Sequence, residues 1–273
     1  MQHEAVNGVV VRVRNMGDHD RYLSVLTAEH GRITLLSKGS RSMRGPQMAI
    51  SQLFGYSNFE FYRRGGLPIL KGGAPIEPFY AIGLDIDRLN LASYLCDLIC
   101  ELTDEGEEAG EQLRLLLNAL YAVSTDRYPQ QIVKGAFEWR LAAMSGYEPD
   151  LGGCHRCGAT EAEALYMDVM NGGVLCGECL HKKGHVARAD LAYDDIREAE
   201  VLCPITPSVL AALRYVQTAP IERLFAFALA DAEERRLFAT CAETYVLSHI
   251  GHGFDTLNFY HAMRATPKKG TNV

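Results

Sequence analysis

Two cysteine pairs, Cys154-His155-Arg156-Cys157 and Cys176-Gly177-Glu178-Cys179, constrain the fold of this chain more than any other stretch. Eighteen residues separate the pairs, a spacing typical of two Cys-x-x-Cys turns that share one tetrahedral zinc ion. Two disulfides, or four unrelated core cysteines, are the alternatives. The repeated spacing favours one structural Zn²⁺ bound by Cys154, Cys157, Cys176 and Cys179, because four cysteines leave no open coordination position for catalysis.

Three nearby histidines, His155, His181 and His185, are candidate replacement ligands. His181 and His185 stand one helical turn apart, but surface histidines are the simpler interpretation. The remaining cysteines are interpreted as small, buried apolar residues: Cys96, Cys100, Cys203 and Cys241.

At 273 residues the chain is long enough to bury a substantial core in two or three modules. Its start lacks a basic segment followed by an apolar one, and no apolar run is long enough to span a bilayer. We therefore expect a soluble cytoplasmic protein, in which cysteines stay reduced.

Charge is distributed unevenly along the chain. Residues 1–80 contain ten Lys and Arg against six Asp and Glu, for a net charge of +4. Residues 81–150 carry −8 and residues 151–273 carry −3, which together give the −7 of the whole chain. A basic first module joined to an acidic body indicates a polyanionic partner for the first module despite the negative total.

The first eighty residues have the alternating pattern of short strands separated by turns. The expected strands are 8–14, 22–26, 32–37, 54–62 and 67–71, and the Gly72, Gly73, Pro75 and Pro78 breakers then end the strand pattern. Five strands without a long helix favour a closed barrel of the oligonucleotide-binding (OB) type.

Beyond residue 80 the apolar spacing becomes helical. The expected helices are 84–102, 111–123, 129–145, 207–216, 221–229, 233–250 and a last turn at 257–263. The predicted fold is therefore α+β, with an N-terminal five-stranded OB-fold barrel and an α-helical domain that contains an inserted four-cysteine zinc module. The expected division is 1–80 barrel, 81–150 first helical part, 151–190 zinc module, 191–265 second helical part and 266–273 disordered tail.

Basic residues of the barrel are the candidate DNA-binding set. Phosphate binding requires cations spaced along a surface, and single-strand binding adds aromatic rings on which bases stack. The candidate cations are Arg12, Arg14, Lys38, Arg41, Arg44, Arg63 and Arg64. The candidate rings are Tyr22, Phe54, Tyr56, Phe59, Phe61 and Tyr62. The alternatives are that Phe59 and Phe61 fill the barrel interior and that the basic loop is solvated surface.

Motifs of common catalytic sites are missing from the sequence. It has no phosphate-binding P-loop, no His-Glu-x-x-His and no Gly-x-Ser-x-Gly. Asp18 and Asp20 beside His19 are better explained as a polar turn than as an acid–base pair. We therefore expect a protein without enzymatic turnover.

Two blocks of the sequence together resemble the RecO family of bacterial recombination mediators. The first is Thr27-Ala28-Glu29-His30-Gly31-Arg32 followed by Lys38-Gly39-Ser40-Arg41, and the second is Phe137-Glu138-Trp139-Arg140-Leu141 followed by Gly146-Tyr147-Glu148-Pro149 and the cysteine pairs. The resemblance covers nearly the whole chain. One departure is Ser51-Gln52-Leu53-Phe54, where family members often have Gln-Pro-Phe.

The resemblance implies a cytoplasmic, nucleoid-associated DNA repair and recombination protein of the RecFOR pathway. It implies binding to single- and double-stranded DNA, strand annealing and, with RecR, help in loading RecA onto DNA coated by single-stranded DNA-binding protein. It also implies recognition of that protein's acidic C-terminal tail by the helical body, for which Arg127, Lys134 and Arg140 are candidate contacts. Alternatives are a zinc-containing adapter that mainly recruits proteins and binds DNA weakly, and a zinc-dependent nucleic-acid enzyme.

Overall fold

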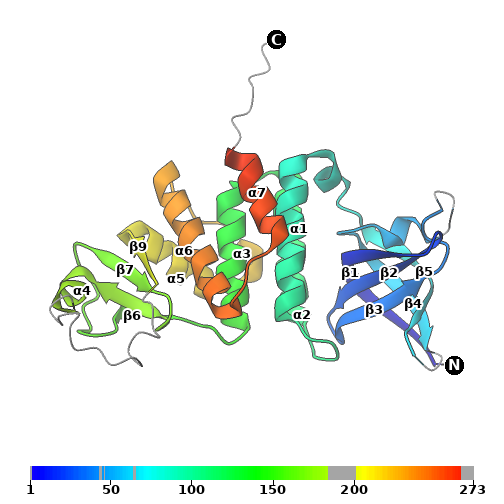
Figure 1. Cartoon of the computed structure of the whole chain (residues 1–273), viewed down its shortest axis with the longest axis horizontal. Coiled ribbons are helices and arrows are strands. Elements are labelled where there is room, and N and C mark those ends of the chain that lie inside the picture. Colours follow the sequence, from blue (N-terminus) through cyan, green and yellow to red (C-terminus); the bar gives the residue numbers. More distant parts are fainter. Residues whose placement is uncertain (1, 43–44, 46, 64–65, 184–200, 266–273) are drawn as a thin grey trace, which may run out of the picture. The chain divides into compact units, whose positions relative to one another are not determined.

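The computed structural model of the chain describes residues 2–42, 45, 47–63, 66–183 and 201–265 (Figure 1). The chain forms two compact units, Met1–Arg127 with Gly253–Val273, and Tyr128–His252. The boundary between them lies inside the range 81–150 that the sequence grouped as one helical part. Packing therefore assigns the helices on either side of residue 127 to different units.

A closed five-stranded barrel forms most of the first unit. Its strands are β1 (Gln2–Met16), β2 (Asp20–Thr27), β3 (Gly31–Ser37), β4 (Tyr56–Arg63) and β5 (Ile69–Glu77). They follow one another around the barrel in the order β1-β2-β3-β5-β4. All neighbours are antiparallel except β3 and β5, which pair in parallel at Leu36 and Ile69. The predicted five-stranded OB-type barrel is confirmed.

Strand β5 continues through the glycines and proline that were expected to end it, so that expectation was wrong. Beyond Ile69 it pairs only with β4, and an unpaired edge tolerates Pro75, which lacks an N–H donor. Gly73 allows close approach to β4, because an added Cβ would lie 2.0 Å from the carbonyl oxygen of Asn58.

The barrel interior is filled by aliphatic side chains and two phenylalanines. Phe59 and Phe61 are both completely buried among residues such as Leu23, Val25 and Leu35. Phe54 is also buried. The interior alternative for Phe59 and Phe61 is therefore confirmed, and among the candidate stacking rings only the three tyrosines retain partial exposure.

Helices α1 (Ile86–Leu102), α2 (Gly110–Thr125) and α7 (Asp255–Ala265) complete the first unit. The acidic α1–α2 loop pairs its backbone with the β2–β3 turn, since Arg32 N donates to Asp104 O at 3.2 Å and Gly106 N donates to His30 O at 3.0 Å. Gly31 makes this contact possible: its φ is +56°, and an added Cβ would lie 2.3 Å from Asp104 O. The loop's carboxylates remain exposed, as expected for a solvated segment.

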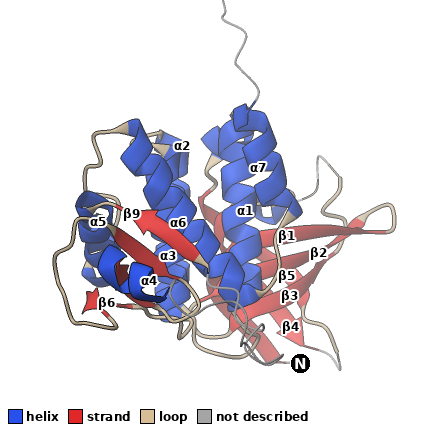
Figure 2. Cartoon of the chain, turned by 60° about the vertical axis from the view of Figure 1, so that its left-hand side comes forward, coloured by secondary structure: helices blue, strands red, loops and turns tan. Residues whose placement is uncertain are grey.

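The second unit combines helices with a small sheet that the sequence did not reveal. Its helices are α3 (Gln130–Met144), α4 (Gly177–Lys183), α5 (Pro207–Thr218) and α6 (Ala232–Ile250). Its strands are β6 (Asp150–Cys154), β7 (Leu165–Asp168), β8 (Gly173–Cys176) and β9 (Leu202–Ile205), in the order β6-β8-β7-β9. Figure 2 shows these strands as a group distinct from the barrel.

The predicted helix 221–229 was wrong, because only Ile221–Arg223 is helical, as a short 3₁₀ turn. Arg235 donates from Nη1 to the carbonyl oxygens of Leu229 and Ala230, both at 2.7 Å. These side-chain bonds satisfy carbonyls at the end of the segment without a further helical turn. Burial of Leu224 and Phe225 then anchors the segment to the core.

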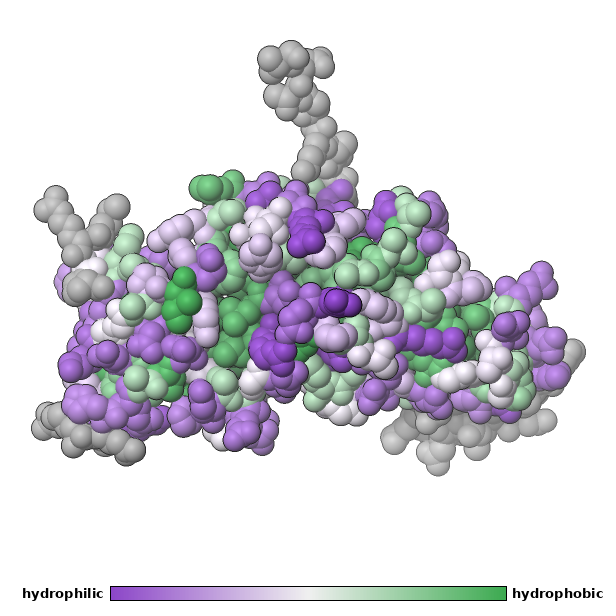
Figure 3. All heavy atoms as spheres, turned by 180° about the vertical axis from the view of Figure 1, so that it is seen from behind, coloured by the Kyte–Doolittle hydropathy of each residue, from purple (hydrophilic) through white to green (hydrophobic). Residues whose placement is uncertain are grey.

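The outer surface is largely hydrophilic on the face seen in Figure 3, with hydrophobic side chains between the polar ones. Among the described helices, none combines the length and apolar composition needed to cross a membrane.

Candidate metal centre and nucleic-acid interface

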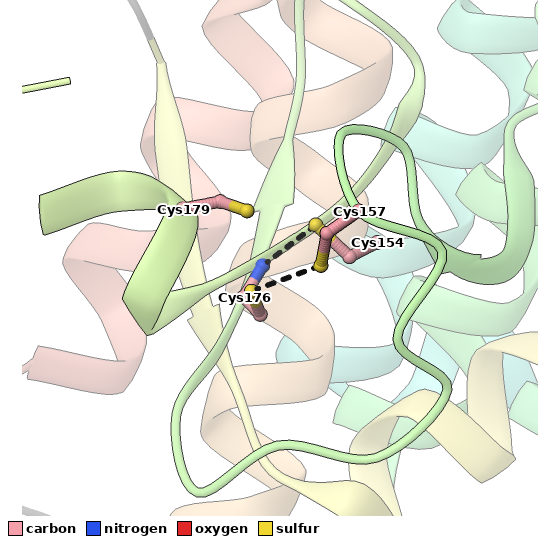
Figure 4. Close-up of side chains that lie close together, drawn as sticks. All are labelled: Cys154, Cys157, Cys176 and Cys179. Atoms are coloured by element: carbon pink, nitrogen blue, oxygen red, sulfur yellow. Dashed lines mark hydrogen bonds between the residues drawn. The ribbon is translucent and has the colours of Figure 1, made fainter. Parts of the chain in front are cut away.

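The four predicted cysteine ligands meet at one point in the second unit (Figure 4). Their Sγ atoms all lie within 4.8 Å of one another, and those of Cys157 and Cys176 are 3.7 Å apart. A zinc ion about 2.3 Å from each of four tetrahedral sulfurs separates the sulfurs by about 3.8 Å. The cluster therefore has the dimensions of a four-thiolate metal site.

Short elements bring the ligands together. Cys154 ends β6 and Cys176 ends β8, while Cys179 lies in the first turn of α4. Cys157 follows in a tight turn closed by a 2.7 Å bond from Gly158 N to Cys154 O. The φ of Gly158 is +74°, which a residue with a side chain adopts only with strain.

Hydrogen bonds stabilise a thiolate in this cluster. Burial opposes ionisation of Cys154, but N–H groups of Cys176, Cys157 and Arg156 lower its pKa to about 6. The pKa of Cys179 rises to about 12, first through its hydrogen bond with Cys157 and then through burial. Four sulfurs this close ionise together only beside a cation, since mutual repulsion otherwise keeps protons on some of them.

All eight cysteines are free thiols, which excludes the disulfide alternative for this structure. The predicted burial of the other four is confirmed: Cys96, Cys100, Cys203 and Cys241 are all buried. Burial raises the pKa of Cys96 and of Cys100. Cys96 and Cys100 therefore serve as packing groups, whereas the hydrogen bond with Cys241 lowers the pKa of Cys203 to about 7.

The nearby histidines are not part of the sulfur cluster among the described residues. His155 Nε2 lies 3.2 Å from Oδ2 of Asp168, so its ring faces a carboxylate. His181 is exposed on α4. His185 lies outside the described residues.

Arg12 and Arg14, two of the predicted DNA-binding cations, lie on one face of the barrel. Arg12 stands opposite Ser24 of β2, and Arg14 stands opposite Tyr22. Both arginines line a groove of about 250 Å³ that runs over the outer face of β1, β2 and β3. The described residues that line it are Arg12, Arg14, Tyr22, Ser24, Arg32, Thr34 and Leu67.

Lys38 and Arg41 lie in the loop after β3, which docks on the β1–β2 turn. Gly39 N donates to Oδ1 of Asp20 at 2.8 Å, Arg41 N donates to His19 O at 3.1 Å, and the Arg41 guanidinium donates to Gly17 O. Both cationic side chains are exposed. They therefore extend the basic surface beyond the Arg14 end of the groove.

Arg63 lies at the other end of β1. It pairs in register with Gln2 and forms an ion pair with Glu4 at 3.0 Å between Nε and Oε1. Arg44 and Arg64 lie outside the described residues. The structure thus brings Arg12, Arg14, Lys38 and Arg41 to one end of β1 and separates Arg63 from them.

Arg32, which the sequence reasoning did not select, also lines the groove. Its Nε lies 3.5 Å from Thr103 O, and Thr34 is the next residue on the same side of β3. The alternation of Arg32, Thr34 and Leu36 along β3 was the available signal.

The three candidate partner contacts have different environments. Arg127 is exposed. Lys134 is only 2% exposed and lies 2.7 Å from Glu138 and 2.5 Å from Glu243, so its ammonium is not on the surface. Arg140 is half-buried and donates to the carbonyl oxygens of Gln217 and Ala219. The latter two therefore hold helices of the second unit together.

Comparison with known proteins gives matches along most of the chain. Residues 1–79 match the family model Recombination protein O N terminal, and residues 83–193 match Recombination protein O C terminal. The DNA repair protein RecO of Acetivibrio thermocellus is 28% identical over 95% of this chain and 96% of its own length. That of Alkaliphilus metalliredigens is 31% identical over 63% of this chain and 70% of its own length. The chain belongs to the RecO family of DNA repair proteins.

Proposed function

We propose that this protein is a DNA repair and recombination mediator that binds single- and double-stranded DNA and anneals complementary strands. With RecR, it helps to load RecA onto DNA coated by single-stranded DNA-binding protein. The observation that carries the proposal is the basic end of the barrel, where Arg12, Arg14, Lys38 and Arg41 gather in a RecO-family chain. The protein acts by binding, without enzymatic turnover, in the bacterial cytoplasm at the nucleoid.

Annealing follows from the physics of a basic surface. Two complementary strands repel each other, and cations that neutralise phosphates on both reduce this repulsion. Holding both strands on one protein also raises their local concentration. Exposed Lys38 and Arg41, beyond the Arg14 end of the groove, supply charges of this kind.

We assign the metal of the four-cysteine cluster as structural zinc. Thiolate ligands favour Zn²⁺, and the separations of the four sulfurs suit its tetrahedral geometry. A bound ion would fix β6, β8 and α4 relative to one another, since each contributes a ligand. Measurement of one zinc per chain in protein purified without chelator is the direct check.

We propose that the acidic tail of single-stranded DNA-binding protein is recognised through the helical parts of the chain. Of the three candidates, Arg127 is exposed, Arg140 is half-buried and Lys134 is buried. The test is a pull-down with single-stranded DNA-binding protein that carries or lacks its last residues. Equal capture of both forms would refute the tail as the point of contact.

The proposal as a whole is tested by DNA binding at several salt concentrations. If about four to six phosphates are neutralised, log affinity for single strands should fall against log salt with a slope of about −3 to −4. Weak binding without a salt slope would instead favour a protein adapter whose DNA contacts are incidental.

A further inference from the structure

The groove over β1, β2 and β3 has a chemical composition that the basic charge of the barrel alone does not explain. Its described lining contains three arginines, one tyrosine, one serine, one threonine and one leucine, and none of these residues is acidic. Cations alone are enough for a surface that attracts the DNA backbone. An aromatic ring beside the cations adds a surface on which an unpaired base of single-stranded DNA can stack.

Strand register places the lining residues of β1, β2 and β3 in adjacent rows, of which the last holds Arg32 opposite Leu26. Arg12, Ser24 and Thr34 form one row across the three strands, and Arg14, Tyr22 and Leu36 form the next. Side chains directly opposite in an antiparallel pair have Cβ atoms about 5 Å apart. Tyr22 and Arg14 are therefore directly opposite each other and both line the groove, on a rigid sheet rather than on a loop.

The arginines of the groove are not equivalent. Arg12 is engaged by Asp97 at 2.9 Å, and Arg32 contacts a backbone carbonyl only through Nε. The side chain of Arg14 is exposed and has no hydrogen-bond or ion-pair partner among the described residues. Arg14 and Arg32 are therefore better placed than Arg12 to bind a phosphate, because each guanidinium can donate two parallel N–H hydrogen bonds to phosphate oxygens.

We propose that this groove is a subsite for one unstacked nucleotide of single-stranded DNA, in which the base stacks on Tyr22 and Arg14 and Arg32 bind adjacent phosphates. The inference rests on the proposed DNA-binding function and deepens it. A recess of about 250 Å³ is below the usual size of a complete ligand pocket, which agrees with a site for one unit of a longer strand. Bases in a duplex are stacked and paired, so duplex DNA gains nothing from the Tyr22 ring.

The test compares two oligonucleotides of equal length, one of thymidines and one of abasic residues with the same phosphates. Wild-type protein should bind the thymidine strand about tenfold more tightly. Tyr22→Leu should remove most of this preference while leaving affinity for the abasic strand and for duplex DNA unchanged. Tyr22→Phe, which keeps the ring, should behave as wild type, and Tyr56→Leu, a half-buried tyrosine outside the groove, should also keep the preference.

Arg32→Gln should weaken binding to both oligonucleotides by a similar factor and reduce the salt slope by about 0.7. Equal affinity of wild-type protein for the two strands, or an unchanged preference in Tyr22→Leu, would overturn the subsite while leaving DNA binding intact. Failure of wild-type protein to bind any of the three DNA probes would instead refute the proposed function itself.

Discussion

Arg12 of strand β1 donates to Oδ1 of Asp97 on helix α1 at 2.9 Å, and Oδ2 of the same carboxylate accepts from Thr256 of α7 at 2.9 Å. The Asp97 carboxylate thus forms an ion pair with the guanidinium of Arg12, which lines the basic groove. The hydrogen bond to Asp97 raises the pKa of Arg12, against the opposing effect of burial. In the proposed DNA complex, Asp97 would therefore compete with phosphate for Arg12.

Asp97→Asn should increase DNA affinity. The amide keeps the shape of the side chain and an acceptor for Thr256, but it removes the negative charge that holds Arg12. We expect a salt slope steeper by about 0.7 for single strands, from one additional phosphate contact. Fluorescence anisotropy over a salt series measures this, with Asp87→Asn on the same helix as the control. A slope equal to that of wild type would show that Arg12 does not contact DNA.

Cys154→Ser should abolish metal binding and unfold the small sheet while the barrel remains folded. Metal-binding free energies in small zinc modules reach about 10 to 16 kcal/mol. Loss of that stabilisation is expected to unfold the small sheet around the cluster. Elemental analysis should find one zinc per chain in wild type and in Cys203→Ala, which changes a cysteine outside the cluster. Full zinc content in a Cys154→Ser/Cys157→Ser variant would disprove the assignment.

Lys134→Met should destabilise the second unit by about 3 to 5 kcal/mol, because it leaves buried Glu138 and its neighbour Glu243 without their shared cation. Urea unfolding measures the loss. The control, Lys134→Met/Glu138→Gln, removes one charge of each sign and should recover part of it. A loss below about 1 kcal/mol in the single variant would mean that the carboxylates find other compensation.

The same ion pairs make stability depend on alkaline pH. Burial disfavours the charged ammonium, but Glu138 and Glu243 outweigh it and raise the pKa of Lys134 above its usual 10.5. A raised folded-state pKa contributes stability that is fully present below pH 10.5 and is lost as the pH rises through the folded-state pKa. Thermal melting from pH 8 to pH 11.5 should therefore show a fall that is smaller in Lys134→Met, where burial of Tyr245, which raises its pKa to about 12, still contributes a fall.

Gly17 and Gly31 have nearly equal positive φ values, but only Gly31 is closely packed. Replacing each with alanine therefore distinguishes the cost of backbone strain from the cost of a steric clash. Gly17→Ala, at φ +58° with no atom within 4 Å of the added Cβ, should cost about 1 to 2 kcal/mol. Gly31→Ala, at φ +56°, adds a clash with Asp104 O at 2.3 Å and should cost about 1 to 3 kcal/mol more. Equal losses of unfolding free energy would show that the α1–α2 loop is not held against the β2–β3 turn.

Local patterns explain what the sequence predicted well. Cys154 and Cys157 are three residues apart, so their spacing alone fixes a turn that faces one metal, and the alternation around Val9 and Leu23 marks strands whose buried faces are set by period two. Features that depend on distant partners were missed. Lys134 was predicted as a partner contact, because its ion pair with Glu243, 109 positions away, cannot be recognised in the sequence. Strand β5 was expected to end at residue 71, because the close approach of Gly73 to Asn58 cannot be recognised there either.

The small sheet of the second unit was missed for a related reason. Strands β7 and β8 have only four residues each, too few for a periodic pattern, and β9 pairs with β7 across a long separation in sequence. Arg32 was overlooked because its neighbours Arg12 and Arg14 come from another strand. The residues that line the groove can be recognised only when the pairing register of β1, β2 and β3 is known.

The central claim, that DNA binds the basic end of the barrel, is tested most directly by charge reversal with a matched control. Lys38→Glu/Arg41→Glu should flatten the salt slope for single-stranded DNA by about 1.4, from two lost contacts, and abolish strand annealing. Arg114→Glu/Arg236→Glu makes the same change in net charge on exposed helical positions and should affect both properties only weakly. Circular dichroism and zinc content should match wild type in both variants. Unchanged DNA affinity and annealing in a folded Lys38→Glu/Arg41→Glu protein would contradict the account.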